Sequence, residues 1–136
     1  MIQTMSISDY RFGSKFDAVY LVVRSLSALH RRCDPILSVA KWLPQLSPEQ
    51  ALYKEYLFWK SSGKWNVNTF ETIYRKHFIE QIINDSKALA AFVELAQRSE
   101  KGENIVLLCY CKDVDLCHRK ILGEILQGQD VDIQIT

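Results

Sequence analysis

The residues best suited to chemistry are three cysteines, a histidine and an arginine that lie close together near the end of the chain. The cysteines are Cys109, Cys111 and Cys117, and the last of them is followed directly by His118 and Arg119. A cysteine at a helix start beside an arginine has a lowered pKa and a more available thiolate. A neighbouring histidine can act as an acid or a base near neutral pH. Cys117 and His118 are therefore the candidate catalytic residues.

The same segment could bind an anion. Cations in the first turn of a helix interact unfavourably with its dipole. We therefore expect a carboxylate or a bound anion near Arg119 and Lys120. Free N–H groups at a helix start attract phosphate, and arginine binds phosphate through paired hydrogen bonds. In the alternative interpretation, Cys109 and Cys117 are small core residues and Asp113 pairs with Arg119. Composition alone does not distinguish an anion-binding site from this packed arrangement.

Zinc is a further alternative, because Cys109, Cys111, Cys117 and His118 offer thiolate and imidazole ligands. Two features argue against it. Consecutive helical residues project about 100° apart, which would keep Cys117 and His118 from one ion. The chain also has no Cys-x-x-Cys pair. We therefore predict no metal ligands and no cofactor.

The elements around this cluster indicate a βαβ unit. Residues 105–108 form a wholly apolar run, typical of a strand buried on both faces. Residues 117–126 follow helical spacing until Gly128, and residues 131–135 alternate like a strand. Such units imply a parallel sheet, and ligands bind outside the carboxyl ends of its strands.

Two earlier strands are expected, over residues 2–7 and 16–23. Arg24 follows the second strand and would reach the same edge as the cysteine cluster if the strands are parallel. The polar loop after the first strand contains Tyr10 and Arg11, which could supply a stacking ring and a cation beside the last helix. The alternative is a plain surface loop.

The middle of the chain is predicted to be mainly helical. Residues 36–43 follow helical spacing, Ser47 caps a helix that runs to about residue 60, Asn68 starts the next, and Ser86 caps another. His77 lies on the inward stripe of its helix and is predicted to be a packed core histidine. No repeat or linker divides the chain. We predict one α/β domain over residues 1–136, with a small, mostly parallel, Rossmann-like sheet flanked by helices and a helical insert.

Composition narrows the class of protein. The chain is 48% hydrophobic and 24% charged, as in ordinary globular proteins. A net charge of +1 gives no general attraction to nucleic acid or membranes. No apolar run approaches the roughly 18 residues of a membrane span, and the start does not resemble a signal peptide. We expect a cytoplasmic protein with reduced thiols and no membrane partner. Nucleic-acid binding is not favoured, and the oligomeric state stays open, a dimer included.

The stretch LLCYCKDVDLCHRKIL resembles domain-of-unknown-function family 488. In that family a buried strand ends in cysteine, Lys-Asp follows, and Cys-His-Arg opens a helix. The matching positions are Cys109, Lys112, Asp113, Cys117, His118 and Arg119. The arginine after Val22-Val23 and the segment 42–48 extend the likeness along the chain. Cys111 departs from the pattern, since family members often have an acidic residue there. The resemblance implies a small α/β sheet and assures no particular reaction.

These observations predict a binding site for a nucleotide or nucleotide-derived, phosphate-bearing ligand at the strand edge. Similar cysteine and Cys-His motifs occur in proteins suspected of handling nucleotides, so this part rests on analogy. Hydrolysis or transfer on the ligand is compatible with the residues. The expected ligand-binding residues are Arg119, Arg24, Cys109, Lys112, Asp113, Tyr10 and Arg11, with His118 as hydrogen-bond donor or general acid.

Two other classes of function remain open. One is a thiol- or metal-dependent enzyme centred on Cys117 and His118. The other is a protein-interaction module in which Trp42, Trp59 and Trp65 of the helical insert contact a partner.

Overall fold

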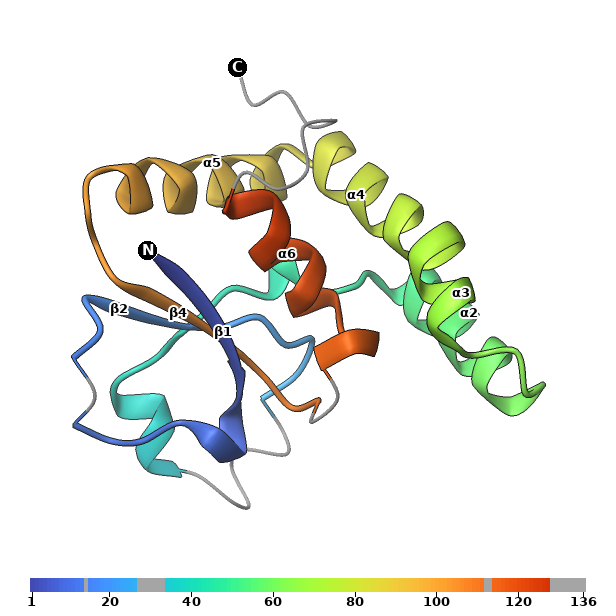
Figure 1. Ribbon diagram of the computed structural model, residues 1–136, viewed down its shortest axis with the longest axis horizontal. Coiled ribbons are helices and arrows are strands. Elements are labelled where there is room, and N and C mark those ends of the chain that lie inside the picture. Colours follow the sequence, from blue (N-terminus) through green and yellow to red (C-terminus); the bar gives the residue numbers. More distant parts are fainter. Residues whose placement is uncertain (14, 27–33, 112–113, 128–136) are drawn as a thin grey trace.

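In the part of the chain that the structure describes, four parallel strands form one sheet (Figure 1). This computed structural model describes residues 1–13, 15–26, 34–111 and 114–127. The strands are β1 (Ile2–Ser6), β2 (Ala18–Leu21), β3 (Lys41–Trp42) and β4 (Ile105–Cys109), in the spatial order β1-β4-β2-β3. Every residue of β4 is buried, as the continuous apolar run predicted, because β4 lies between two strands and under helices. The α/β class and the parallel sheet are confirmed.

The short strand β3 replaces a helix that the spacing predicted over residues 36–43, so that prediction is wrong. The helical part of this segment is a short 3-10 helix (Asp34–Ser38) that ends at Ser38. Lys41–Trp42 then pair with β2. The amide of Leu43 donates to Leu21 over 2.9 Å. A residue before proline favours extended backbone, and Leu43 precedes Pro44. The strand predicted over residues 131–135 lies outside the described residues.

The first part of the helical insert between β3 and β4, residues 50–84, extends to the right of the sheet in Figure 1, whereas its last helix, residues 86–100, lies above the sheet. The insert consists of a 3-10 turn (Pro44–Leu46), α2 (Gln50–Ser61), α3 (Val67–Thr69), a π-helical turn (Phe70–Tyr74), α4 (Arg75–Asn84) and α5 (Ser86–Glu100). The helices predicted from about residues 47, 68 and 86 are present. No helix among the described residues is long and apolar enough to cross a bilayer.

The predicted helix starts are displaced by one or two residues. Ser47 is buried and its hydroxyl donates to the carbonyl of Pro44 over 2.5 Å, so Glu49 stands at the N-cap of α2 instead. Asn66 caps α3 by accepting from the amide of Thr69. Asp85, rather than Ser86, caps α5. Several polar residues near each helix start could serve as its N-cap, and contacts with the rest of the fold determine which residue does.

A series of aromatic rings connects the insert to the last helix, α6 (His118–Leu126). Trp59 and Trp65 stack with centroids 5.9 Å apart, and Trp65 meets Tyr74 edge-on at 5.3 Å. Tyr74 stacks on Phe78 at 6.3 Å, and Phe78 meets the His118 ring at 5.5 Å. The insert therefore packs directly against the residue that opens α6.

His77 is not a core histidine, contrary to the prediction. Its ring lies at the surface, with Nδ1 3.2 Å from Glu55 Oε2. The inward stripe of this helix is Phe70, Tyr74 and Phe78, which recur at a spacing of four residues. His77 precedes Phe78 by one residue and is turned about 100° away from that stripe.

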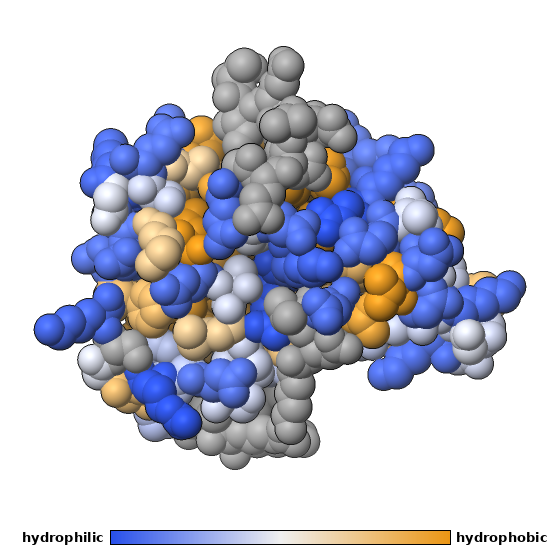
Figure 2. All heavy atoms as spheres, in the orientation of Figure 1, coloured by the Kyte–Doolittle hydropathy of each residue, from blue (hydrophilic) through white to orange (hydrophobic). Residues whose placement is uncertain are grey.

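An ion-pair network fixes α6 against the α3–α4 stretch. Arg75 bonds Glu71 at 2.9 Å and Glu124 at 2.7 Å, while Lys120 bonds Glu71 at 3.0 Å. Lys120 also pairs with Glu124 of its own helix, at the longer distance of 3.9 Å. Glu71, on a different helix, therefore supplies a countercharge for the first turn of α6. Polar and charged residues cover most of the face seen in Figure 2, with apolar residues in separate patches.

Candidate functional site

Three of the predicted site residues meet in the core, between the end of β4 and the start of α6. The Sγ atoms of Cys109 and Cys117 are 3.6 Å apart, and Cys117 Sγ is 3.7 Å from Nδ1 of His118. All three side chains are buried, and their potential ligand atoms lie within 4.8 Å of one another. Two thiols and an imidazole thus share one small volume.

The backbone of Cys117 explains how two consecutive residues can face the same point. Cys117 is the N-cap of α6, with φ −119° and ψ 140°, which is extended rather than helical. The expected separation of about 100° between neighbouring side chains applies within a helix and so does not hold here. The geometric objection to a shared ligand for Cys117 and His118 is therefore wrong.

His118 is fixed in one tautomer. Its Nε2 lies 2.6 Å from the carbonyl oxygen of Val22, which can only accept, so Nε2 carries the hydrogen. Burial lowers the pKa of His118 and favours the neutral ring. The lone pair of Nδ1 then faces the sulfur of Cys117.

The thiols differ in their ionisation from what the sequence predicted. The pKa of Cys117 is raised, not lowered, because of its hydrogen bonds with Cys109 and Cys111 and its burial. The pKa of Cys109 rises to about 11, first through its hydrogen bond with Cys111. Hydrogen bonds from Cys109 and Cys117 lower the pKa of Cys111, and the nearby charge of Arg119 adds to this. Cys111, which was not among the predicted site residues, is therefore the most acidic of the three.

A cavity of about 380 Å³ opens beside this cluster, at the carboxyl ends of β2 and β4. Its wall combines the residues after each strand with tyrosines of the insert. The lining residues are Val23, Arg24, Ser25, Pro48, Tyr53, Tyr56, Tyr74, Cys109, Tyr110, Cys111 and His118. The structure thus brings together Arg24, Cys109 and His118, as expected for parallel strands that end at one edge.

Arg24 is the cation of the cavity wall. Its guanidinium lies 4.4 Å above the Tyr53 ring and donates to Oε1 of Gln50. Among the ion pairs found in the described residues, none joins Arg24 to a carboxylate. Tyr110, which also lines the cavity, donates its hydroxyl to the carbonyl of Ser25 over 2.7 Å, which ties the ends of β4 and β2 together.

Other predicted residues lie outside the cavity wall. Arg119 is buried and donates to the carbonyl of Cys111 over 3.2 Å, so it supports the segment after β4. Tyr10 is buried with its ring 5.4 Å from that of Phe12, and Arg11 is exposed. Lys112 and Asp113 lie outside the described residues.

Sequence reasoning did not place Tyr53, Tyr56 or Tyr74 at the site. Their helical spacing predicts packing, and nothing in that spacing shows that one edge of each ring faces a cavity. The π-helical turn at Phe70–Tyr74, which places Tyr74 here, also left no signal in the residue types.

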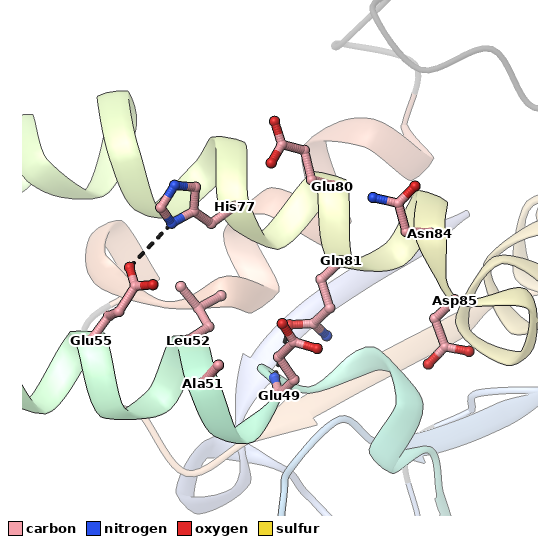
Figure 3. A pocket seen from close by; sticks show the side chains of 9 residues that line it. All are labelled: Glu49, Ala51, Leu52, Glu55, His77, Glu80, Gln81, Asn84 and Asp85. Carbon is pink, nitrogen blue, oxygen red and sulfur yellow. Dashed lines mark hydrogen bonds and ion pairs between the residues drawn. The ribbon is translucent and has the colours of Figure 1, made fainter.

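A second cavity, of about 300 Å³, lies between α2 and α4 and has no cysteine in its lining (Figure 3). Its rim is acidic, with Glu49, Glu55, Glu80 and Asp85. Gln81 spans it by accepting from the amide of Glu49 and donating to the carbonyl of Ser47, each over 2.8 Å. These bonds connect the two helices and account for its polar lining.

Comparison with known proteins identifies a family. Residues 2–130 match the model of a family described as the "Active DUF488-N3 subclade". No curated protein and no solved structure matches the chain. The match covers nearly the whole sequence, including both strands and the helix that build the cavity. The chain therefore belongs to the DUF488 family.

Proposed function

We propose that this protein binds a nucleotide or a nucleotide-derived, phosphate-bearing molecule in the tyrosine-lined cavity. The observation that carries the proposal is the composition of that cavity: aromatic walls, one arginine and the Cys-His cluster at its floor. Its volume of about 380 Å³ falls in the range of small-molecule sites. Its position matches the usual ligand site of open α/β sheets.

The tyrosines suit a flat base. Tyr53 and Tyr56 come from α2 and Tyr110 follows β4, so aromatic side chains border the cavity from both the insert and the sheet. Stacking of a base on an aromatic ring contributes about 1–3 kcal/mol and tolerates different bases. This supports a nucleotide-like ligand without selecting one base.

Arg24 suits a phosphate. It is already held in place by the Tyr53 ring and by the neutral amide of Gln50, so a bound anion would not have to displace a carboxylate. Arginine forms paired, charge-assisted hydrogen bonds with phosphate. In this proposal Arg24 is the principal phosphate ligand, and Arg119 is a positioning residue that holds the backbone of Cys111.

Turnover of the ligand would involve the floor of the cavity, where Cys109, Cys111 and His118 are the groups nearest to it. The matching family's description includes the word "active", which agrees with hydrolysis or transfer there. Thiol catalysis by Cys117 loses support because its pKa is raised and it does not line the cavity. The metal-dependent alternative is favoured by the geometry of the cluster.

A thermal-shift screen tests the proposal. The probes are AMP, GMP, CMP, UMP and ADP-ribose, with adenosine and inorganic phosphate as separate arms. We expect at least one nucleotide to raise Tm of the wild type, and to do so more than either adenosine or phosphate. Arg24→Gln should abolish most of that shift. Arg11→Gln serves as the matched control, because Arg11 is exposed and does not line the cavity. No stabilisation by any nucleotide, or an equal shift in Arg24→Gln, would overturn the proposal.

A further inference from the structure

We propose that Cys109, Cys111, Cys117 and His118 bind a zinc ion at the floor of the cavity. The proposal rests on the geometry of the cluster and does not depend on the nucleotide. Three of these groups are already placed at ligand spacing, and the fourth stands on the side that faces the cavity.

The distances match those of a tetrahedral site. Zinc–sulfur bonds of about 2.3 Å and zinc–nitrogen bonds of about 2.0–2.1 Å place two sulfurs about 3.8 Å apart, and sulfur and nitrogen about 3.6 Å apart. The Sγ atoms of Cys109 and Cys117 are 3.6 Å apart, and Cys117 Sγ is 3.7 Å from His118 Nδ1. The side chains need little movement to accept an ion.

His118 is oriented as a metal ligand. A metal-bound imidazole typically donates its other N–H to a carbonyl or carboxylate, which fixes the ring and its tautomer. Here Nε2 donates to the Val22 carbonyl over 2.6 Å, so the lone pair on Nδ1 faces the sulfur of Cys117, and the sulfur of Cys109 lies within 4.8 Å. Packing alone does not require an unprotonated nitrogen to lie beside a pair of thiols.

Cys111 completes the set. Its side chain is exposed at the cavity, which it lines together with Cys109 and His118. Three thiolates and one Zn²⁺ carry a net charge of −1. The buried guanidinium of Arg119, which donates to the carbonyl of Cys111, lies beside that charge. The charge of the loaded site is thus compensated within the core.

Metal analysis of the wild type is the first test. The protein is purified without metal-affinity resin or chelator, and its metal content is measured by inductively coupled plasma mass spectrometry. We expect about one zinc per chain. After replacement of zinc by Co²⁺, the reduced protein should show thiolate-to-cobalt charge-transfer absorption and the visible bands of tetrahedral cobalt. A folded, reduced wild type that neither carries zinc nor binds Co²⁺ with these bands would overturn the proposal.

Variants then identify the ligands. Cys117→Ser should weaken Co²⁺ binding at least tenfold, while His77→Asn, a histidine at the surface of α4, should leave it unchanged. Cys111→Ser should still bind Co²⁺ but lose about a third of the charge-transfer intensity, because one of three sulfur ligands is gone. Unchanged intensity in Cys111→Ser would remove Cys111 from the site, and unchanged affinity in Cys117→Ser would refute the cluster as the binding site. Far-UV circular dichroism confirms that each variant is folded.

Discussion

The Nε2 atom of His118 lies 2.6 Å from the carbonyl oxygen of Val22, so the first residue of α6 is hydrogen-bonded to the backbone just after β2. This bond holds the ring beside Cys117, at the border of the cavity that His118 lines. Its removal should therefore affect both the stability of the fold and the arrangement of the site.

His118→Ala is expected to lower the free energy of unfolding by about 2–4 kcal/mol. The substitution leaves the buried Val22 carbonyl without its donor and opens a void beside Phe78. Urea denaturation at pH 7 measures the change. His77→Ala is the control and should stay within about 0.5 kcal/mol of the wild type, since His77 is at the surface. Equal losses in the two variants would contradict the structural role of the Val22 bond.

Glu71→Gln should lower the free energy of unfolding near neutral pH, and the decrease should be smaller at acidic pH. Burial raises the pKa of Glu71, but the hydrogen bonds from Arg75 and Lys120 outweigh burial and leave the pKa below its ordinary 4.5. The folded state therefore releases this proton more readily than the unfolded state. The resulting stabilisation is complete above the unfolded pKa and is lost as pH falls through the folded one.

Urea denaturation of wild type and Glu71→Gln at about pH 7 and at stepwise lower pH checks this. The difference between their unfolding free energies should shrink progressively below pH 4.5. Glu80→Gln, an exposed position on α4, should show no such trend. A difference that is constant with pH would mean that the ion pairs of Glu71 do not stabilise the contact between α4 and α6.

Gly123 allows α6 to lie close to β1. A Cβ at this position would be 3.1 Å from Cγ2 of Thr4, a tight contact. In a helix, alanine is more favourable than glycine by about 1 kcal/mol. In Gly123→Ala we expect the close contact with Thr4 to offset this gain in helix stability. When Thr4→Ala is added, the contact is removed and the gain should reappear. A double-mutant cycle by urea denaturation should give a coupling of at least about 0.5 kcal/mol between the two sites. Strict additivity would show that Thr4 does not restrict position 123.

Tyr53→Leu should weaken nucleotide binding by about 5- to 150-fold, the range that corresponds to loss of one stacking contact. The substitution also removes the ring beneath Arg24. Tyr53→Phe should retain most of the affinity because it keeps the ring. Phe58→Leu is the matched control, since Phe58 is on the same helix, is exposed and does not line the cavity. Fluorescence titration with an N-methylanthraniloyl nucleotide distinguishes the variants. Similar affinities for all three would place the ligand elsewhere.

The sequence predicted which residues gather at the edge of the sheet, because the relevant signals are local. The apolar run of β4 and the helical spacing after Cys117 place Cys109 and His118 at one edge of a parallel sheet. Arg24 follows from the same argument, since it comes directly after β2. These residues are positioned by strand ends and a helix start, which residue types indicate directly.

The parts that were predicted wrongly depend on contacts between distant segments. The acidity of Cys117 was inferred from the helix dipole and Arg119, whereas hydrogen bonds among the three thiols reverse it. The helix predicted over residues 36–43 does not form, because Lys41–Trp42 pair with β2 as a strand. The cavity wall could not be predicted either, because it requires knowing how the insert folds back over the sheet.

The most direct test of the ligand site is isothermal titration calorimetry of the nucleotide that gives the largest thermal shift. The titration is run against wild type, Arg24→Gln and Arg11→Gln under identical conditions. The account predicts one binding site per chain in the wild type, binding at least about tenfold weaker in Arg24→Gln, and an unchanged Kd in Arg11→Gln. The same Kd in wild type and Arg24→Gln, or a loss of affinity in Arg11→Gln alone, would contradict it.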